Sequence, residues 1–258
     1  SAKIIETLKA TDALLQHAPL RHSYPHCWRH KTPVIFRATP QWFISMEEKH
    51  LRADSLRSIR EAVQWTPDWG QNRIEAMVEN RPDWCISRQI WYGHRIPVWY
   101  RMQTSQTNAD LADNTEIHVG VEAPTGDGWT QDEDTLDTWF SSALWPFSTL
   151  GWPHNTEELN YYYPTSVLVT GYDIIFFWVV RMAFAGMFCM GETPFKHVLI
   201  HGLVRDSEGR KMSKSLGNGI DPLEVIDQYG ADALRFMLAT GNSPGNDMRF
   251  YMERVEAA

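Results

Sequence analysis

The stretch Ser166-Val-Leu-Val-Thr-Gly-Tyr-Asp-Ile-Ile-Phe-Phe-Trp178 changes its hydrophobic pattern at a single glycine. The β-branched run before Gly171 predicts a buried strand, and the long apolar run from Tyr172 to Met190 predicts a helix. A second apolar strand is expected at His197–Val204. Continuous apolar strands that alternate with helices indicate an α/β fold, in which a parallel sheet is covered on both faces.

The apolar run from Tyr172 to Met190 is also long enough to cross a membrane. However, Asp173 opens it and Arg181 lies near its centre, where a charge is costly in a bilayer. We therefore interpret the run as a buried helix of the α/β domain, and we expect no association with a membrane.

Further elements follow from spacing and from helix-start signals. We expect a weaker strand at Cys85–Gln89 and a loop or small β excursion at 104–134. Helices are expected at Ala53–Val63, Asn72–Glu79, Leu223–Tyr229 (after the start signal Asp221-Pro222) and Ala231–Ala239.

Composition excludes several classes of protein. Of the 258 residues, 43% are hydrophobic and 22% are charged, which is typical of a globular protein and not of a disordered or collagen-like one. Three cysteines without a C-x-x-C pair argue against a disulfide scaffold and indicate a reducing, cytoplasmic setting. No secretory leader is evident at Ser1–Ala10.

Charge is distributed unevenly along the chain. The net charge is −8, yet residues 1–60 carry ten Lys and Arg against five Asp and Glu. This basic end could meet a phosphate backbone, or it could be a solvated face of mixed charge. His26, Cys27 and His30 offer only three clustered metal ligands with no fourth placed by spacing, so we expect no metal site.

The segment Gly209-Arg-Lys-Met-Ser-Lys-Ser-Leu-Gly217 is the strongest chemical signal in the chain. Its two lysines and its hydroxyls form a loop rich in hydrogen-bond donors, which is suited to a polyphosphate. Cations at such a site stabilise the charge that a leaving pyrophosphate gains, by about 3 kcal/mol for each well-placed donor.

Within this loop, Lys211-Met-Ser-Lys-Ser215 resembles the second signature of class I aminoacyl-tRNA synthetases. Residues 90–258 resemble the valine-type members, through stretches such as Val169-Thr-Gly-Tyr-Asp-Ile-Ile-Phe-Phe-Trp178. Residues 1–89 resemble the isoleucine-type members, through stretches such as His22-Ser-Tyr-Pro-His-Cys27. The change near Gln89 suggests a recombined or engineered chain, and a divergent natural enzyme is the alternative.

The resemblance implies the second half of a Rossmann-like catalytic domain. Residues 1–60 would be a connective segment returning from an editing domain, and residues 61–258 would be the C-terminal half of the catalytic domain. The first signature of the family, His-Ile-Gly-His, is absent, because His118-Val-Gly-Val121 lacks the final histidine. The first catalytic half, the editing domain and the anticodon-binding domain are accordingly expected to lie outside this sequence.

The resemblance also implies roles for individual residues. Lys211 and Lys214 would be catalytic and hold the phosphates of ATP, which is used with Mg²⁺. Other residues implied at the ATP site are Gly171, Asp173, His201, Gly202, Met212, Ser213 and Ser215. The amino-acid pocket would be walled by Trp139, Ile174 and Trp178. From the residues alone, Asp173 could be a simple helix cap and His201 a core histidine, and Arg88 could contact the tRNA 3′ end or pack near the active site.

The implied reaction joins valine to ATP as valyl-adenylate and then transfers the valyl group to tRNA. A ligase of isoleucine type, or a fragment that binds ATP or tRNA without catalysis, is the alternative. One methylene distinguishes valine from isoleucine by only about 1–3 kcal/mol, so binding alone separates them weakly. We expect the isolated chain to activate valine weakly or not at all.

Overall fold

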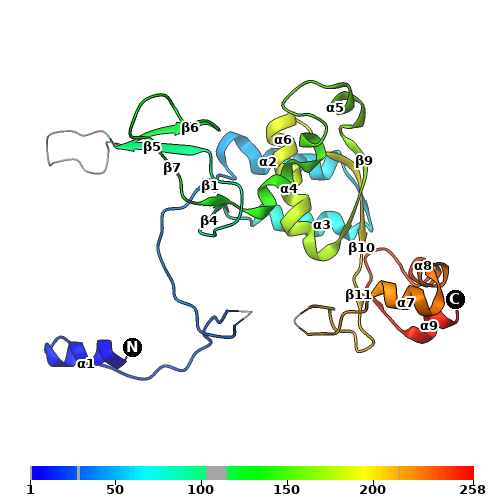
Figure 1. Ribbon diagram of the computed structural model, residues 1–258, viewed down its shortest axis with the longest axis horizontal. Coiled ribbons are helices and arrows are strands. Elements are labelled where there is room, and N and C mark those ends of the chain that lie inside the picture. Colours follow the sequence, from blue (N-terminus) through cyan, green and yellow to red (C-terminus); the bar gives the residue numbers. More distant parts are fainter. Residues whose placement is uncertain (1, 28–29, 103–114, 215) are drawn as a thin grey trace. The chain divides into compact units, whose positions relative to one another are not determined.

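The computed structural model describes residues 2–27, 30–102, 115–214 and 216–258. Contacts divide the chain into two compact units, residues 1–40 and 41–258 (Figure 1). The first unit has the helix α1 (Ala2–Ala10), which has no buried residue, and a β-bridge between His26 and Pro33. The contact boundary thus falls at Pro40, and the assignment of residues 1–60 to a connective segment stays a prediction.

The second unit contains the remaining elements. Its strands are β1 (Phe43–Ile44), β2 (Gln64–Thr66), β3 (Trp84–Cys85), β4 (Ser87–Arg88), β5 (Val98–Met102), β6 (Thr115–Val119), β7 (Thr130–Gln131), β8 (Thr135–Leu136), β9 (Thr165–Gly171), β10 (Phe195–His201), β11 (Val204–Arg205) and β12 (Met248–Arg249). Its helices are η1 (Glu48–His50), α2 (Leu51–Glu61), α3 (Trp69–Glu79), α4 (Thr138–Ser148), α5 (Glu157–Tyr162), η2 (Tyr172–Ile174), η3 (Ile175–Val179), α6 (Val180–Met190), α7 (Pro222–Tyr229), α8 (Ala231–Thr240) and α9 (Met252–Glu256).

A three-stranded parallel sheet in the order β2-β10-β9 organises this unit. The two apolar strands expected from the sequence are β9 and β10, and they pair in register, with Gly171 opposite His201. The third parallel strand is β2, a short segment that the sequence analysis missed. The expected strand at Cys85–Gln89 instead forms β3 and β4, and both of these pair antiparallel in separate two-stranded sheets.

The hydrophobic core lies on one face of the sheet, where α2, α3, η3 and α6 pack (Figure 1). Val198 and Ile200 of β10 point into this core and are fully buried. On the opposite face, Val167 and Val169 of β9 remain 52% and 55% exposed. The expectation of a sheet covered on both faces was therefore wrong for the described residues, because the helices that share its core, α2, α3, η3 and α6, lie on one face.

The long apolar segment Tyr172–Met190 is a helix, as expected, although it begins with a 3₁₀ turn (η2) and a π-helical turn (η3) before α6. It is long and apolar enough to span a membrane, and 44% of its most apolar window is buried inside the protein. Ile175, Val179 and Met182 lie in the core beneath the sheet. The segment thus packs as a core helix of the α/β unit.

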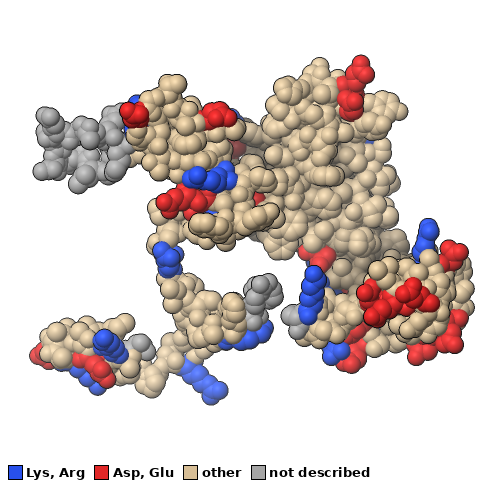
Figure 2. All heavy atoms as spheres, in the orientation of Figure 1, with Lys and Arg blue, Asp and Glu red and all other residues tan. Residues whose placement is uncertain are grey.

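The C-terminal helices α7, α8 and α9 enclose a second, smaller apolar cluster that includes Val225 and Met237. Asp221 caps α7 by accepting a hydrogen bond from the Leu223 N–H, as the Asp-Pro start signal predicts. Acidic side chains gather over these helices in the view of Figure 2. Residues 115–131, within the expected β excursion, form β6 and β7 beside β5.

Candidate nucleotide site at the ends of the parallel strands

Four of the predicted ATP-site residues lie together at the carboxyl ends of two parallel strands. Gly171 ends β9 and is paired with His201, which ends β10. Asp173 follows in η2, and Gly202 follows directly after β10. The carboxyl ends of parallel strands are where open α/β sheets bind nucleotides, so this edge is the candidate site.

The lysine loop reaches this edge of the sheet. The ammonium Nζ of Lys211 lies 2.7 Å from the carboxylate Oδ2 of Asp173. The backbone of Lys211 also forms an isolated antiparallel β-bridge with Arg205 of β11, and this pairing ties the loop to the strand that follows the site. Lys214 is exposed, and no ion pair of its ammonium is found within the described parts of the chain. The loop therefore presents one lysine held at the strand ends and one directed to solvent.

The other predicted loop residues have different surroundings. Met212 is partly buried and packs against the apolar cluster of α7–α9, so it anchors the loop. The Ser213 N–H donates to the side-chain oxygen of Asn218 at 2.9 Å, and its hydroxyl accepts from the Leu216 N–H at 3.2 Å. Ser215 lies outside the described residues.

A second polar group supports the same edge and was missed by sequence reasoning. Asp247 accepts hydrogen bonds from the Leu203 N–H at 2.7 Å and from the Tyr172 hydroxyl at 2.9 Å, and it is ion-paired with Arg205. Burial raises the pKa of Asp247, but these hydrogen bonds and the Arg205 charge outweigh it and hold the pKa below the usual value. Asp247 lies 75 residues from Tyr172, and no spacing rule connects them.

Two glycines at the site have close neighbours where a side chain would begin. A Cβ at Gly202 would lie 1.9 Å from the backbone oxygen of Asn246, and a Cβ at Gly171 would lie 2.9 Å from Oδ1 of Asp173. Real side chains do not tolerate the first contact, so only glycine fits there. Gly202 thus lets the segment before β12 pass directly over the end of β10.

The three predicted pocket residues lie on two neighbouring segments, α4 and η2–η3, which pack together. Trp139 stacks on Phe177 with ring centroids 5.8 Å apart, and the Trp178 indole N–H donates to the Ser142 carbonyl at 3.2 Å. Trp178 lines a cavity of about 870 Å³ that α4, α5 and the edge strand β9 also line. Neither Trp139 nor Ile174 is among the described residues that line this cavity, and the amino-acid pocket stays a prediction.

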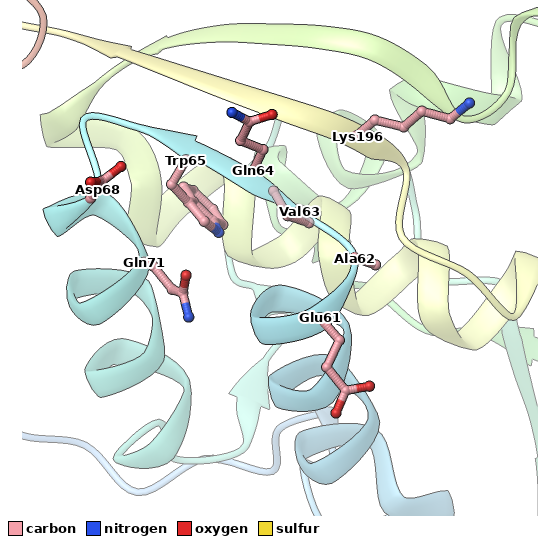
Figure 3. Close-up of a pocket in the computed structure, with 8 residues that line it drawn as sticks. All are labelled: Glu61, Ala62, Val63, Gln64, Trp65, Asp68, Gln71 and Lys196. Carbon is pink, nitrogen blue, oxygen red and sulfur yellow. The ribbon is translucent and has the colours of Figure 1, made fainter.

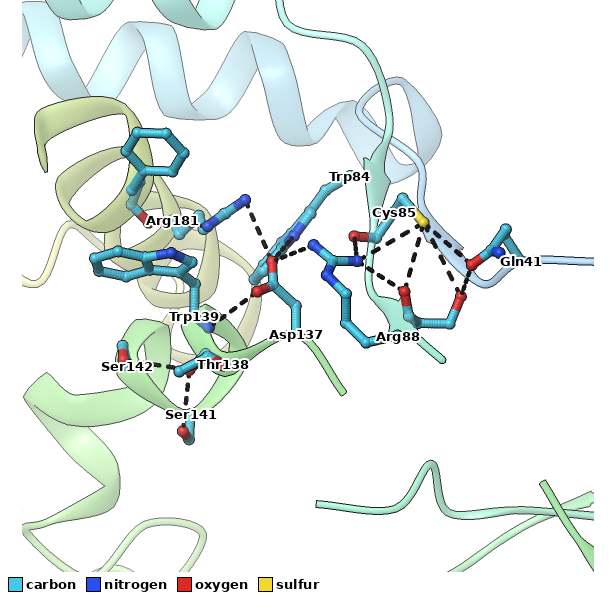
Figure 4. A network of polar contacts seen from close by, with 12 residues as sticks. Gln41, Trp84, Cys85, Arg88, Asp137, Thr138, Trp139, Ser141, Ser142 and Arg181 are labelled. Carbon is cyan, nitrogen blue, oxygen red and sulfur yellow. Dashed lines mark hydrogen bonds and ion pairs between the residues drawn. The ribbon is translucent and has the colours of Figure 1, made fainter. Parts of the chain in front are cut away.

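A buried ionic network holds Trp139 in place (Figure 4). Asp137 caps α4 by accepting from the Trp139 N–H, and its Oδ2 lies 3.0 Å from Arg88 and 3.3 Å from Arg181. Oδ2 also accepts from the Trp84 indole N–H at 2.9 Å. Asp137 thus connects Arg88 to a predicted pocket residue, Trp139. The same carboxylate explains how Arg181 is accommodated in an apolar helix.

The network carries more positive than negative charge. Arg81 is only 4% exposed, and its guanidinium stacks 4.1 Å from the Phe176 ring without an ion pair among the described residues. Burial, together with the nearby Arg181 charge, lowers the pKa of Arg81 to about 10. The pKa of Arg181 is lowered by burial as well, although Asp137 opposes the shift. The Asp137 carboxylate therefore offsets part of the positive charge of the arginines in this network.

Another cavity, of about 550 Å³, lies at the opposite edge of the sheet, where β2 and β10 begin (Figure 3). Lys196 and Gln64 line it, together with Glu61 at the end of α2. Because nucleotides bind at the carboxyl ends of parallel strands, we do not assign this cavity to the candidate site. No cluster of three or more His, Cys, Asp or Glu that could hold a metal occurs among the residues that the structure describes.

Comparisons with known proteins agree with the fold and with the resemblance. The family described as tRNA synthetases class I (I, L, M and V) matches residues 9–251. A methionyl-tRNA synthetase of Mycobacterium tuberculosis, solved with methionyl-adenylate, has a similar fold, with a TM-score of 0.62 and 21% identity over 90% of this chain and 39% of that one. The chain belongs to the class I tRNA synthetase family.

Curated relatives are valine–tRNA ligases. That of Halalkalibacterium halodurans is 53% identical over 257 residues, and that of Geobacillus kaustophilus is 54% identical over 258 residues. Each alignment covers 99% of this chain and 28% of the relative, so the chain spans just over a quarter of their length. Because the alignments include residues 1–89, the interpretation of that part as an isoleucine-type segment in a recombined chain gains no support.

Proposed function

We propose that this chain supplies part of the catalytic domain of a valine–tRNA ligase. The observation that carries the proposal is the identity of 53% with such a ligase over 99% of the chain. The placement of the lysine loop beside the strand ends supports it, since a cationic loop there suits the phosphates of ATP. The protein would act in the cytoplasm on valine, ATP and tRNA.

In this reaction the carboxylate of valine attacks the α-phosphorus of ATP. A new P–O bond forms, the bond to pyrophosphate breaks, and a ribose hydroxyl of tRNA then displaces AMP from the valyl carbonyl. No side chain becomes covalently bonded, so the protein contributes positioning and charge stabilisation. Mg²⁺ would come with ATP and neutralise charge on its phosphates.

The residues then take the following roles. Lys211 and Lys214 would contact the phosphates, and the Asp173 carboxylate would accept hydrogen bonds from the ribose hydroxyls. The backbone at Gly171, His201 and Gly202 would border the adenosine. Met212, Ser213 and Ser215 would complete the loop, and Trp139, Ile174 and Trp178 would wall the valine side chain. The first signature and the remaining catalytic half would come from residues outside this sequence.

The test is valine-dependent exchange of pyrophosphate into ATP by the complete protein. Lys211→Ala and Lys214→Ala are each expected to lower the exchange rate by about 10²–10³-fold, as expected when a cation aimed at the transition state is lost. Lys196→Ala is the matched control, because this exposed lysine lies at the opposite edge of the sheet. Exchange that depends on isoleucine and not on valine would contradict the assigned substrate.

A part that binds ATP or tRNA without catalysis is the second candidate, because an exposed cationic loop at the strand ends would suit binding of phosphates without catalysis as well. Mixing the isolated chain with a separately produced missing half separates the two candidates. A lysine-dependent gain of exchange supports the ligase, whereas unchanged exchange with intact ATP binding supports the binding role.

A further inference from the structure

The lysine loop is closed across its base by one side chain, Asn218. Its Oδ1 accepts from the Ser213 N–H at 2.9 Å, and its Nδ2 donates to the Lys211 carbonyl at 3.3 Å. The same Nδ2 donates to Oδ2 of Asp206 at 2.9 Å. A single amide group therefore binds the loop backbone on either side of Met212 and fastens it to a residue outside the lysine motif.

Asp206 is the fixed end of this arrangement. It is 7% exposed and follows β11, and its carboxylate also accepts from the backbone N–H of Arg210 at 2.7 Å and from Nε of Arg210 at 2.8 Å. The backbone closes a tight turn here, since the Gly209 N–H donates to the Asp206 carbonyl at 2.9 Å. Asp206 is thus rigidly placed before the loop begins.

We propose that Asn218 and Asp206 are positioning residues that hold residues 211–213 in the conformation that binds phosphate. This inference rests on the proposed ATP site and deepens it. A loop that must be ordered on binding loses affinity through the entropy of ordering. Because the Asn218 amide orders the backbone in advance, that entropy is lost during folding and does not weaken the binding of ATP.

The two lysines are affected differently. Lys211 has its carbonyl bound by Asn218 and its ammonium on Asp173, so both ends of the residue are fixed. Lys214 lies beyond the bonded segment and is exposed. Loss of the Asn218 amide therefore disturbs Lys211 first.

The first measurement is hydrogen exchange of the Ser213 amide in the complete protein. Asn218→Ala is expected to speed this exchange roughly tenfold, since its acceptor is lost, while the amides of the β9–β10 sheet keep their rates. Asn80→Ala removes an amide that donates to the Ala76 carbonyl at the end of its own helix, and it is expected to change neither exchange rate. Unchanged exchange at Ser213 in Asn218→Ala would overturn the proposal.

The second measurement separates positioning from a merely structural role. Asn218→Ala is expected to raise the Kd and the KM for ATP roughly tenfold while the KM for valine stays unchanged. The thermal midpoint is expected to fall only slightly, through loss of the hydrogen bond to Asp206. Asn218→Asp retains the acceptor for Ser213 but places a second carboxylate against Asp206, so its affinity for ATP is expected to fall at least as far. ATP binding equal to that of the parent protein in both variants would also overturn the proposal.

These measurements stand apart from the proposed function. If the parent protein shows no valine-dependent exchange yet binds ATP, the assignment as a valine ligase fails while the effect of Asn218 on ATP binding still decides this inference. If ATP does not bind at all, residues 211–213 do not bind its phosphates. The proposed ATP site and the positioning role of Asn218 are then both wrong.

Discussion

Lys211 and Asp173 form an ion pair of 2.7 Å across 38 residues of sequence. The Lys211 side chain is 61% exposed, and that of Asp173 is 27% exposed. An exposed pair of this kind contributes about 0–1 kcal/mol to stability. Its importance is therefore that it places a cation of the loop at the ends of β9 and β10.

Asp173→Asn tests this distinction. We expect the midpoint of thermal unfolding to stay nearly unchanged, because the pair is exposed. The KM for ATP is expected to rise, because the proposed ribose contact and the position of Lys211 would both be lost. Asp227→Asn, an exposed carboxylate on α7, serves as the control. A large loss of stability with an unchanged KM would show that Asp173 is structural.

Gly202→Ala tests the close passage of the chain over β10. We expect a loss of about 1–3 kcal/mol or more in the free energy of unfolding, measured by urea denaturation, because the new methyl group would overlap the Asn246 carbonyl. Gly219→Ala is the matched control, since nothing lies within 4 Å of the position its Cβ would take. Equal stability of the two variants would mean that the backbone at Asn246 shifts to accommodate the methyl group at little energetic cost.

Asp137→Ala tests the buried network beneath Trp139. We expect a loss of about 3–5 kcal/mol, because Arg181 would be left buried and unpaired. The double variant Asp137→Ala with Arg181→Met is expected to recover part of that loss in urea denaturation. Asp54→Ala, which breaks only the exposed pair with Arg57, is expected to have little effect. A double variant less stable than Asp137→Ala alone would contradict this account.

Asp206 gives a prediction for pH. Hydrogen bonds from Asn218 and Arg210 lower its pKa from the ordinary 3.8 to about 2. The unfolded chain therefore binds this proton first as the pH falls, so the stabilising contribution is full above about pH 4 and is lost between about pH 4 and pH 2. The difference in stability between the parent protein and Asp206→Asn is expected to shrink across that window. If the stability difference between the two proteins stays constant across this pH window, the titration of Asp206 does not change the stability of the fold.

The sequence predicted the elements whose pattern is long and continuous. Strands β9 and β10 and the helix after Gly171 were correct because their residues are apolar over many positions. The short strand β2 was missed because three residues, Gln64-Trp-Thr66, carry too little periodicity to stand out. Cys85–Gln89 has strand character, but pairing with distant partners decides whether such a segment is parallel or antiparallel.

The same limit applies to the site. Sequence reasoning predicted Gly171, Asp173 and Lys211 at the site because each lies in a recognisable local motif. The fold places them at the same strand ends, and their roles stay predictions. It missed Asp247 and left Arg88 undecided, since their partners, Tyr172 and Asp137, are distant in the chain and only the fold brings them together. Asn218 follows the lysine motif closely, but its amide contacts depend on how the loop turns.

Strand β9 occupies the end of the sheet, and it has no second neighbour among the described strands. With Val167 and Val169 uncovered beside that free edge, two copies of this polypeptide can pair edge to edge through their backbones. Light scattering of these 258 residues alone is thus expected to report self-association at raised concentration, and such particles would reflect the uncovered strand and not a quaternary state of the complete protein.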